Sequence, residues 1–89
     1  MIIPKKFKLA GIEWKVIINP HLSALGECHP EKGIIFIRDP SMPQPLLEQT
    51  FCHELVHAIL FSTGDNGPHD EKFVDGFAYL LHQYMITAK

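Results

Sequence analysis

The sequence lacks several features that would place it outside the ordinary globular proteins. It has no apolar run that approaches about 18 residues, so we expect no membrane span. Its first residues, Met1 to Lys6, lack the apolar segment of a secretory signal peptide. It also has no internal repeat, linker or low-complexity stretch. These absences predict a single domain over residues 1–89 that is located in the cytoplasm.

Cysteine is scarce, and positive charge is not in excess. The two cysteines, Cys28 and Cys52, form no C-x-x-C pair. Cys52 lies in an apolar helical run, which favours a buried free thiol, while a disulfide to Cys28 is the alternative. Charged residues make up 20% of the chain, with a net charge of −2. A general nucleic-acid-binding protein would carry an excess of positive charge, so nucleic acid is not the expected partner.

The hydrophobic pattern places strands first and helices last. Two β-rich segments, residues 7–9 and 12–18, flank Ala10-Gly11 and predict a β-hairpin. Residues 26–29 are a candidate short strand, and residues 33–39 give the strongest strand signal in the chain. We therefore expect an α+β fold with a small sheet of antiparallel type, followed by two C-terminal helices.

The predicted helices have clear starts. Pro45 fits the first turn of a helix from Leu46 to about Thr63, because the missing N–H of proline is not needed there. Pro68 followed by two acids predicts the start of a second helix over residues 70–86. The expected apolar face of the first helix is Leu47, Phe51, Leu55, Ala58 and Ile59. That of the second helix is Phe73, Val74, Phe77, Ala78, Leu81 and Met85.

The first predicted helix carries His53-Glu54-Leu55-Val56-His57, an H-E-x-x-H motif. Two histidines four residues apart share one helix face, so both can bind one zinc ion with the glutamate beside the metal-bound water. Residues 46–89 are also acidic, with six Asp/Glu against two Lys/Arg, which suits a cation. We therefore predict Zn²⁺ as cofactor, His53 and His57 as ligands, and Glu54 as the general base of peptide-bond hydrolysis.

The third ligand stays open from residue chemistry alone. Catalytic zinc usually has three protein ligands, and Leu60 stands where a metzincin would have glycine, which excludes that class. Glu71 and His69 are both candidates, but residues two apart on a helix point in different directions, so both cannot easily face the metal. Asp75, one turn after Glu71, is a candidate to orient a ligand.

Two families resemble the second helix and its start. The stretch from Glu71 to Leu81 resembles the E-x-x-A-N-x-F-A-x-x-L-L stretch of ImmA/IrrE-type metallopeptidases, although Val74 and Asp75 replace its Ala-Asn. The whole chain also resembles small H-E-x-x-H proteins of phages and prophages. This resemblance implies a minimal zincin-like domain with Glu71 as third ligand, which we prefer. Secondly, residues 69–73 resemble the SprT-like pattern, in which a histidine four residues before Phe or Trp is the ligand, here His69.

The predicted function is that of a zinc metalloendopeptidase acting on a protein or peptide. Alternatives are a non-catalytic metal-binding regulatory module on the same scaffold and a SprT-like DNA-associated protease. The substrate is expected along residues 34–38 by strand addition, unless that strand is central in the sheet. A second copy or a partner protein is a candidate to complete the cleft of so small a domain. Candidate donors to the oxyanion are His69, His82, Tyr79 and Tyr84.

Overall fold

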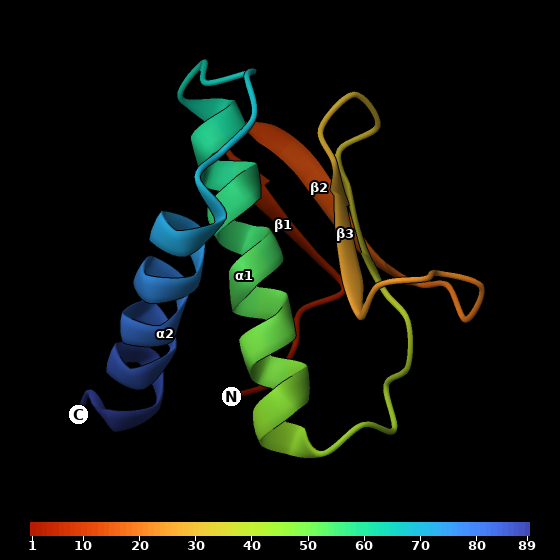
Figure 1. Cartoon of the computed structure of the whole chain (residues 1–89), viewed down its shortest axis with the longest axis vertical. Helices are drawn as coiled ribbons and strands as arrows, with labels where there is room; N and C mark the ends of the chain where they lie inside the picture. The colour runs from red at the N-terminus through yellow and green to blue at the C-terminus, as the bar shows by residue number, and fades with distance from the viewer.

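The computed structural model describes all 89 residues, as four strands followed by two helices. The elements are β1 (Lys6–Leu9), β2 (Ile12–Ile18), β3 (Gly26–His29), β4 (Ile34–Ile37), α1 (Gln44–Ser62) and α2 (Glu71–Thr87). Figure 1 shows α1 between the sheet and α2, so the molecule has three layers. The predicted α+β class and the predicted order of the elements are confirmed.

The sheet has the strand order β1-β2-β4-β3. β1 and β2 form the predicted hairpin, with Phe7 opposite Trp14. Its turn residues Ala10 and Gly11 have φ angles of 50° and 78°, as a two-residue hairpin turn requires. β2 and β4 pair in parallel, whereas β3 and β4 pair antiparallel. The sheet is therefore mixed and not wholly antiparallel as expected. The parallel pair arises because β4 lies between β2 and β3 instead of at the outside of the sheet.

This order makes β4 an internal strand and β3 an edge strand. The prediction that residues 34–38 offer a free edge to a substrate is therefore wrong. β4 has the uninterrupted apolar sequence of a strand with neighbours on both sides, and Ile35 and Ile37 are fully buried. The free edge that lies closest to the helices belongs to β3.

The core lies between the sheet and α1 and extends to α2. Its buried residues are Trp14, Ile35, Ile37, Phe51, Cys52, Val56, Ala58, Val74 and Ala78. The ring of Phe51 meets that of Phe7 edge-on at 6.2 Å, which fixes α1 against the hairpin. Cys52 is buried and free, as predicted, and Cys28 is also a free thiol.

α1 begins and ends on the expected signals, and α2 begins where the sequence predicts. α1 starts at Gln44 with Pro45 in its first turn, and Gly64 follows its end with φ of +97°. This left-handed conformation favours glycine. α2 is capped by Asp70, whose side chain accepts a hydrogen bond of 3.0 Å from the Lys72 amide. The predicted bounds are thus confirmed to within about two residues.

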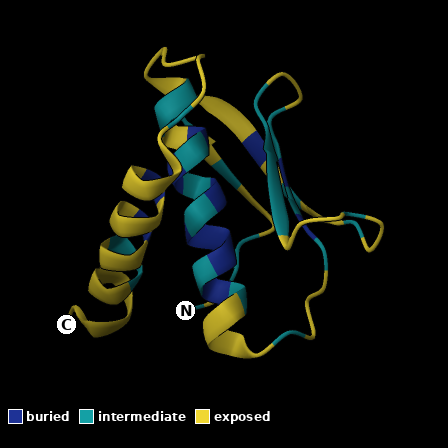
Figure 2. Cartoon of the chain, in the orientation of Figure 1, coloured by how far each residue is buried: buried dark blue, intermediate teal, exposed yellow.

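The apolar face predicted for α2 is too wide. Val74 and Ala78 are buried, but Phe73 and Phe77 are each 50% exposed and Met85 is 40% exposed. Figure 2 shows that most of α2 is exposed to solvent. Only α1 packs against α2, so a single narrow strip of its surface is covered.

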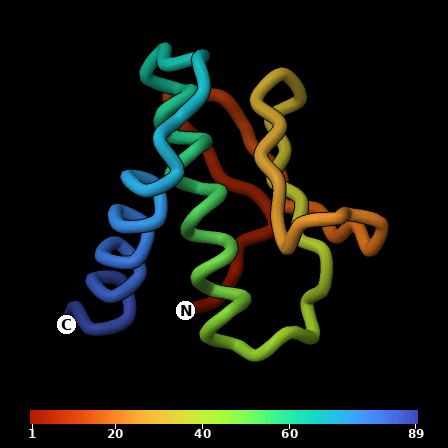
Figure 3. The backbone as a smooth tube through the Cα atoms, in the orientation of Figure 1, coloured from red at the N-terminus to blue at the C-terminus, as the bar shows by residue number.

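The segment between the helices turns the chain back on itself. Figure 3 shows α2 returning alongside α1 in the opposite direction. The first turn of α2 therefore lies beside the last turns of α1, which brings Glu71 to the motif histidines. Neither helix is both long enough and apolar enough to cross a membrane.

Candidate metal centre

Three side chains from the two helices converge on one point. His53 and His57 project from α1 with ring centroids 5.0 Å apart. The carboxylate of Glu71 lies 3.0 Å from Nε2 of His53 and 3.1 Å from Nε2 of His57. All three ligand atoms lie within 4.8 Å of one another. Ligands about 2.1 Å from a tetrahedral zinc ion stand roughly 3.4 Å apart, so the cluster has the right size for zinc.

Nδ1 of His57, the ring nitrogen that does not face Glu71, is held by a short chain of hydrogen bonds. Its Nδ1 lies 2.6 Å from Nδ1 of His69, and Nε2 of His69 lies 2.9 Å from the carbonyl oxygen of Asp65. A carbonyl oxygen only accepts, so a neutral His69 donates from Nε2 and accepts at Nδ1. His57 must then donate from Nδ1, which leaves a lone pair on its Nε2. This assignment directs a metal-binding atom at Glu71.

His53 is oriented in the same way by a carboxylate. Its Nδ1 lies 2.8 Å from Oδ1 of Asp75, one turn along α2 from Glu71. The carboxylate accepts the Nδ1 proton and leaves the lone pair of Nε2 facing Glu71. Asp75 thus stands where the sequence predicts an orienting residue.

The electrostatics of the cluster favour a bound cation. Burial lowers the pKa of His57, although the carboxylate of Glu71 raises it, so His57 favours its neutral form. Two imidazole lone pairs then face a carboxylate at about 3 Å. A cation placed between the two rings and the carboxylate would satisfy all three acceptors at once.

Glu54 lies beside this cluster on the part of α1 that faces β3. It is only 8% exposed. Burial is the main cause that raises the pKa of Glu54 to about 7, and the carboxylates of Glu71 and Glu27 raise it further. A carboxyl group whose pKa lies near neutral pH can both take up and return a proton.

Gly26 allows β3 to approach this part of α1. A Cβ atom at Gly26 would lie 2.9 Å from Cγ2 of Thr50 and 3.1 Å from Cγ of Glu54. Real Cβ atoms essentially never come as close as the first of these distances, so a larger residue would push β3 away from the helix. The absence of a side chain at this position therefore sets the place of Glu54 against the sheet.

A groove follows the edge of β3 on both sides of Glu54. One hollow of about 350 Å³ lies toward Leu25 and Thr50, and another of about 320 Å³ lies toward His69. Glu54 lines both hollows. An extended chain laid in the groove would pass directly over Glu54.

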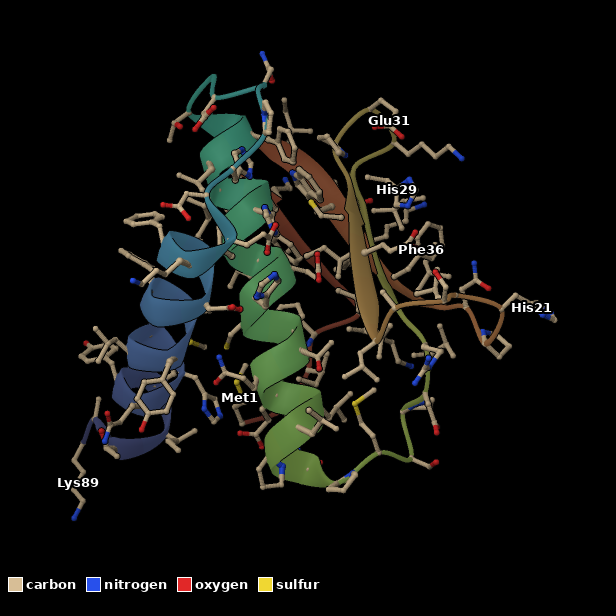
Figure 4. The ribbon with its side chains drawn as sticks, in the orientation of Figure 1. Met1, His21, His29, Glu31, Phe36 and Lys89 are labelled. Atoms are coloured by element: carbon tan, nitrogen blue, oxygen red, sulfur yellow. The ribbon has the colours of Figure 1, made fainter.

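The edge of β3 offers backbone groups to this groove. The Arg38 amide donates to the Leu25 carbonyl at 2.9 Å. Bonded residues alternate along an antiparallel pair, so the N–H and C=O groups of Gly26 and Cys28 point to the open side. Figure 4 shows His29 on the far side of the sheet from α1, beside Phe36. β3 therefore presents the backbone groups of Gly26 and Cys28 to the groove.

The structure separates the four candidate oxyanion donors. His69 borders the groove, but both of its ring nitrogens are already in contact, with His57 and with Asp65. His82 lies three turns along α2 and contacts Glu48 at 2.7 Å. Tyr79 and Tyr84 are exposed and line neither hollow. The predictions for His82, Tyr79 and Tyr84 are wrong, because the helix carries them away from the groove.

Sequence reasoning missed several residues that line the groove. Gln49 lies four residues before His53, so helical spacing alone would place it on the same face. Thr50 also lines the groove, next to Gly26. No local signal identifies Gly26 as the contact with Glu54, because that depends on which strand occupies the edge.

The fold and the site together define an α+β protein with a candidate H-E-x-x-H metal centre. Residues 5–83 match the SprT-like family, and the chain belongs to that family. The family is one of zinc-associated, protease-like domains. The comparison with curated proteins and the comparison with solved structures each give no significant match. The SprT-like resemblance, placed second from the sequence, is thus confirmed, and no match supports ImmA/IrrE.

Proposed function

We propose that the protein is a zinc-dependent peptidase whose metal is held by His53, His57 and Glu71. The observation that carries the proposal is the convergence of two ring lone pairs and one carboxylate at about 3 Å. Both rings are held from behind, by Asp75 and by His69, as metal-binding histidines usually are. Membership of the SprT-like family supports the same class of protein.

The chemistry follows from the position of Glu54. Zinc, when bound at such a site, activates a water molecule and polarises a carbonyl group. Glu54 takes one proton from the attacking water and delivers it to the nitrogen of the leaving amine. The water oxygen bonds to the carbonyl carbon and the C–N bond breaks. The second proton of the water also passes to the amine, so a carboxylate and an ammonium group result. Burial raises the pKa of Glu54 above that of an exposed glutamate, which helps this carboxyl group to take up the proton that it later returns.

The substrate we propose is an extended peptide segment that pairs with β3. The outward backbone groups of Gly26 and Cys28 can bind it by strand addition, and the two hollows can receive its side chains. The groove is bordered by Glu54 and Asp75, whose charges disfavour a nucleic-acid backbone. A protein substrate therefore fits better than DNA.

The catalytic role is tested with Glu54→Gln. We expect this variant to keep stoichiometric zinc but to lose about 10²–10⁴-fold in cleavage of an unfolded protein such as casein. Glu48→Gln is the matched control, because Glu48 lies on the same helix and is similarly exposed, 7% against 8%. If Glu54→Gln cleaves as fast as the wild type, the catalytic proposal fails. If neither protein cleaves any peptide but both bind zinc, the non-catalytic module is the better assignment.

The third ligand is tested by measuring zinc content in Glu71→Ala and His69→Ala. The carboxylate of Glu71 faces Nε2 of both rings, whereas His69 faces Nδ1 of His57. We therefore expect Glu71→Ala to lose zinc and His69→Ala to keep it, with affinity about 10–100-fold weaker. The reverse result would make His69 the ligand, in agreement with the SprT-like pattern.

A further inference from the structure

The outer face of α2 is apolar although it is exposed. Phe73 and Phe77 are each 50% exposed, Leu80 is 64% exposed and Tyr84 is 67% exposed. We call these four residues the outer seam. From Gly76 to Ala88 the chain contains no Lys, Arg, Asp or Glu. A surface helix normally carries charged residues on its outer face, so this helix lacks the usual solvated surface.

The spacing of the outer seam is typical of a helix that packs against another helix. Its residues follow one another at intervals of four, three and four, which is the heptad spacing of a helix–helix contact. The buried strip of α2, Val74, Ala78 and Leu81, has the same spacing and packs against α1. α2 is thus suited to contact two helices, of which the chain itself supplies one.

We propose that the second helix is α2 of another copy of this chain, packed antiparallel across a two-fold axis. In this arrangement Phe73 faces Tyr84 of the second copy and Phe77 faces Leu80, so the same four residues form both sides. A two-fold contact needs such self-complementarity. The antiparallel direction also opposes the two helix dipoles favourably.

The area of the face agrees with that of a stable dimer. An apolar groove lined by Val56, Ile59, Leu60, Phe73 and Phe77 adjoins the outer seam, and Ile59 is itself 37% exposed. At about 200 Å² for each large side chain, the outer seam and Ile59 expose roughly 500 Å². A standard interface buries about 800 Å² on each partner, of which roughly 60% is apolar. The face therefore supplies about the apolar area that one side of a dimer needs.

Charge does not oppose this contact. The chain has a net charge of only −2, and the charged residues of α2 lie outside the outer seam. A contact through the outer seam would bring no two side chains of like charge together. Glu71 and Asp75 point roughly 160° away from the centre of the seam, so dimerisation would leave the metal centre open. The inference is therefore independent of the proposed function.

Analytical ultracentrifugation of the full chain over a wide range of concentration tests the dimer. We expect the wild type to dimerise, and Tyr84→Lys and Leu80→Lys each to raise the dimer dissociation constant by about tenfold or more. Tyr79→Lys is the matched control, because Tyr79 is 60% exposed on the same helix but points roughly 140° away from Tyr84. Circular dichroism would verify that each variant folds, and its zinc content should equal that of the wild type.

Three results would overturn the proposal. One is a wild type that stays monomeric at every concentration. Another is a dimer that Tyr79→Lys weakens as much as Tyr84→Lys does, since the contact would then not follow the outer seam. The third is a monomer that binds vesicles of phosphatidylcholine through Tyr84 and Leu80, which would make a lipid surface the occupant of this face.

Discussion

Two clusters of histidine and carboxylate join α1 to α2, and they differ in how they are completed. At one end, His53 and His57 face Glu71, whose side chain is 64% exposed. At the other end, His82 contacts Glu48, whose side chain is only 9% exposed. The same residue types thus form an open cluster beside a groove and a closed cluster between packed helices.

The closed cluster is balanced by its own neighbours. Glu48 accepts hydrogen bonds from Gln44 at 2.7 Å and from the amino group of Met1 at 3.2 Å, besides its contact with His82. These donors, His82 first, lower the pKa of Glu48 to about 2. Figure 4 shows Met1 beside the end of α1 that carries Glu48. The cluster therefore needs no further ion and acts as a structural link.

The open cluster has an excess of acceptors. Glu71, Asp75 and Glu54 surround two rings whose Nδ1 protons are already donated to Asp75 and His69. No lysine or arginine forms an ion pair with Glu71 or Asp75. A histidine–carboxylate contact therefore indicates a metal centre only where no further proton donor is available to the carboxylate.

The largest effect that separates the two clusters is that of zinc on stability. At free zinc about 1,000 times the dissociation constant, we expect stabilisation by about 4 kcal/mol, seen as a higher melting temperature that a chelator reverses. His57→Ala should abolish the zinc-dependent shift. His82→Ala should lower the melting temperature but keep the shift. A shift of equal size in both variants would show that zinc does not bind at the open cluster.

The next effect concerns the buried acid of the open cluster in zinc-free protein. Because the pKa of Glu54 is raised from 4.5 to about 7, the folded state keeps a proton that the unfolded state loses between these values. Stability should therefore fall as pH rises from 4.5 to 7, by about 3 kcal/mol. Glu54→Gln should remove this loss and be more stable than the wild type at neutral pH. Urea unfolding in the presence of chelator at pH 4.5 and at pH 7 measures this change in the free energy of unfolding. The prediction fails if Glu54→Gln loses as much stability between the two pH values as the wild type does.

A smaller effect is expected when a methyl group is added at Gly26, where β3 lies close to the open cluster. Gly26→Ala places a methyl group against Thr50 and Glu54, which should destabilise the protein by about 1–3 kcal/mol. Gly76→Ala is the control, since a methyl group there meets nothing within 4 Å. It should stabilise α2 by up to about 1 kcal/mol. If urea unfolding gives both variants the same sign, β3 does not rest on Glu54 as described.

The parts of this molecule that local chemistry determines could be predicted from the sequence. Pro45, Gly64 and Asp70 each mark a helix end through their own backbone or side chain, and the structure places those ends as expected. The spacing of His53 and His57 likewise needs only a helix to bring the two rings together.

The rest depends on long-range packing, which no local pattern contains. Residues 34–37 are apolar whether their strand lies at the edge or inside, so the sequence could not identify β3 as the border of the groove. Phe73 and Val74 are equally apolar neighbours, and only the position of α1 decides that Val74 is buried. The part played by His69 depends on the turn that brings it to Nδ1 of His57.

The smallest effect should come from the closed cluster and should have the opposite dependence on pH. The pKa of Glu48 is lowered from 4.5 to about 2, chiefly by the hydrogen bond with His82, so its ionised form is favoured in the folded state. This contribution is complete above pH 4.5 and is lost as pH falls toward 2. Glu48→Gln should therefore lower the melting temperature by a few degrees at neutral pH and by less in acid.

The pH profile of Glu48→Gln then completes the comparison of the two clusters. Loss of an ionised acid from the closed cluster weakens the neutral protein, whereas loss of the acid from the open cluster strengthens it in the absence of zinc. Thermal melts of both variants with chelator should differ in sign at neutral pH, and the loss caused by Glu48→Gln should shrink as the pH falls from 4.5 toward 2. If Glu48→Gln is the more stable protein at neutral pH, the closed cluster is not a structural link. The contact between Glu48 and His82 would then not be what holds the two helices together at the end away from the groove.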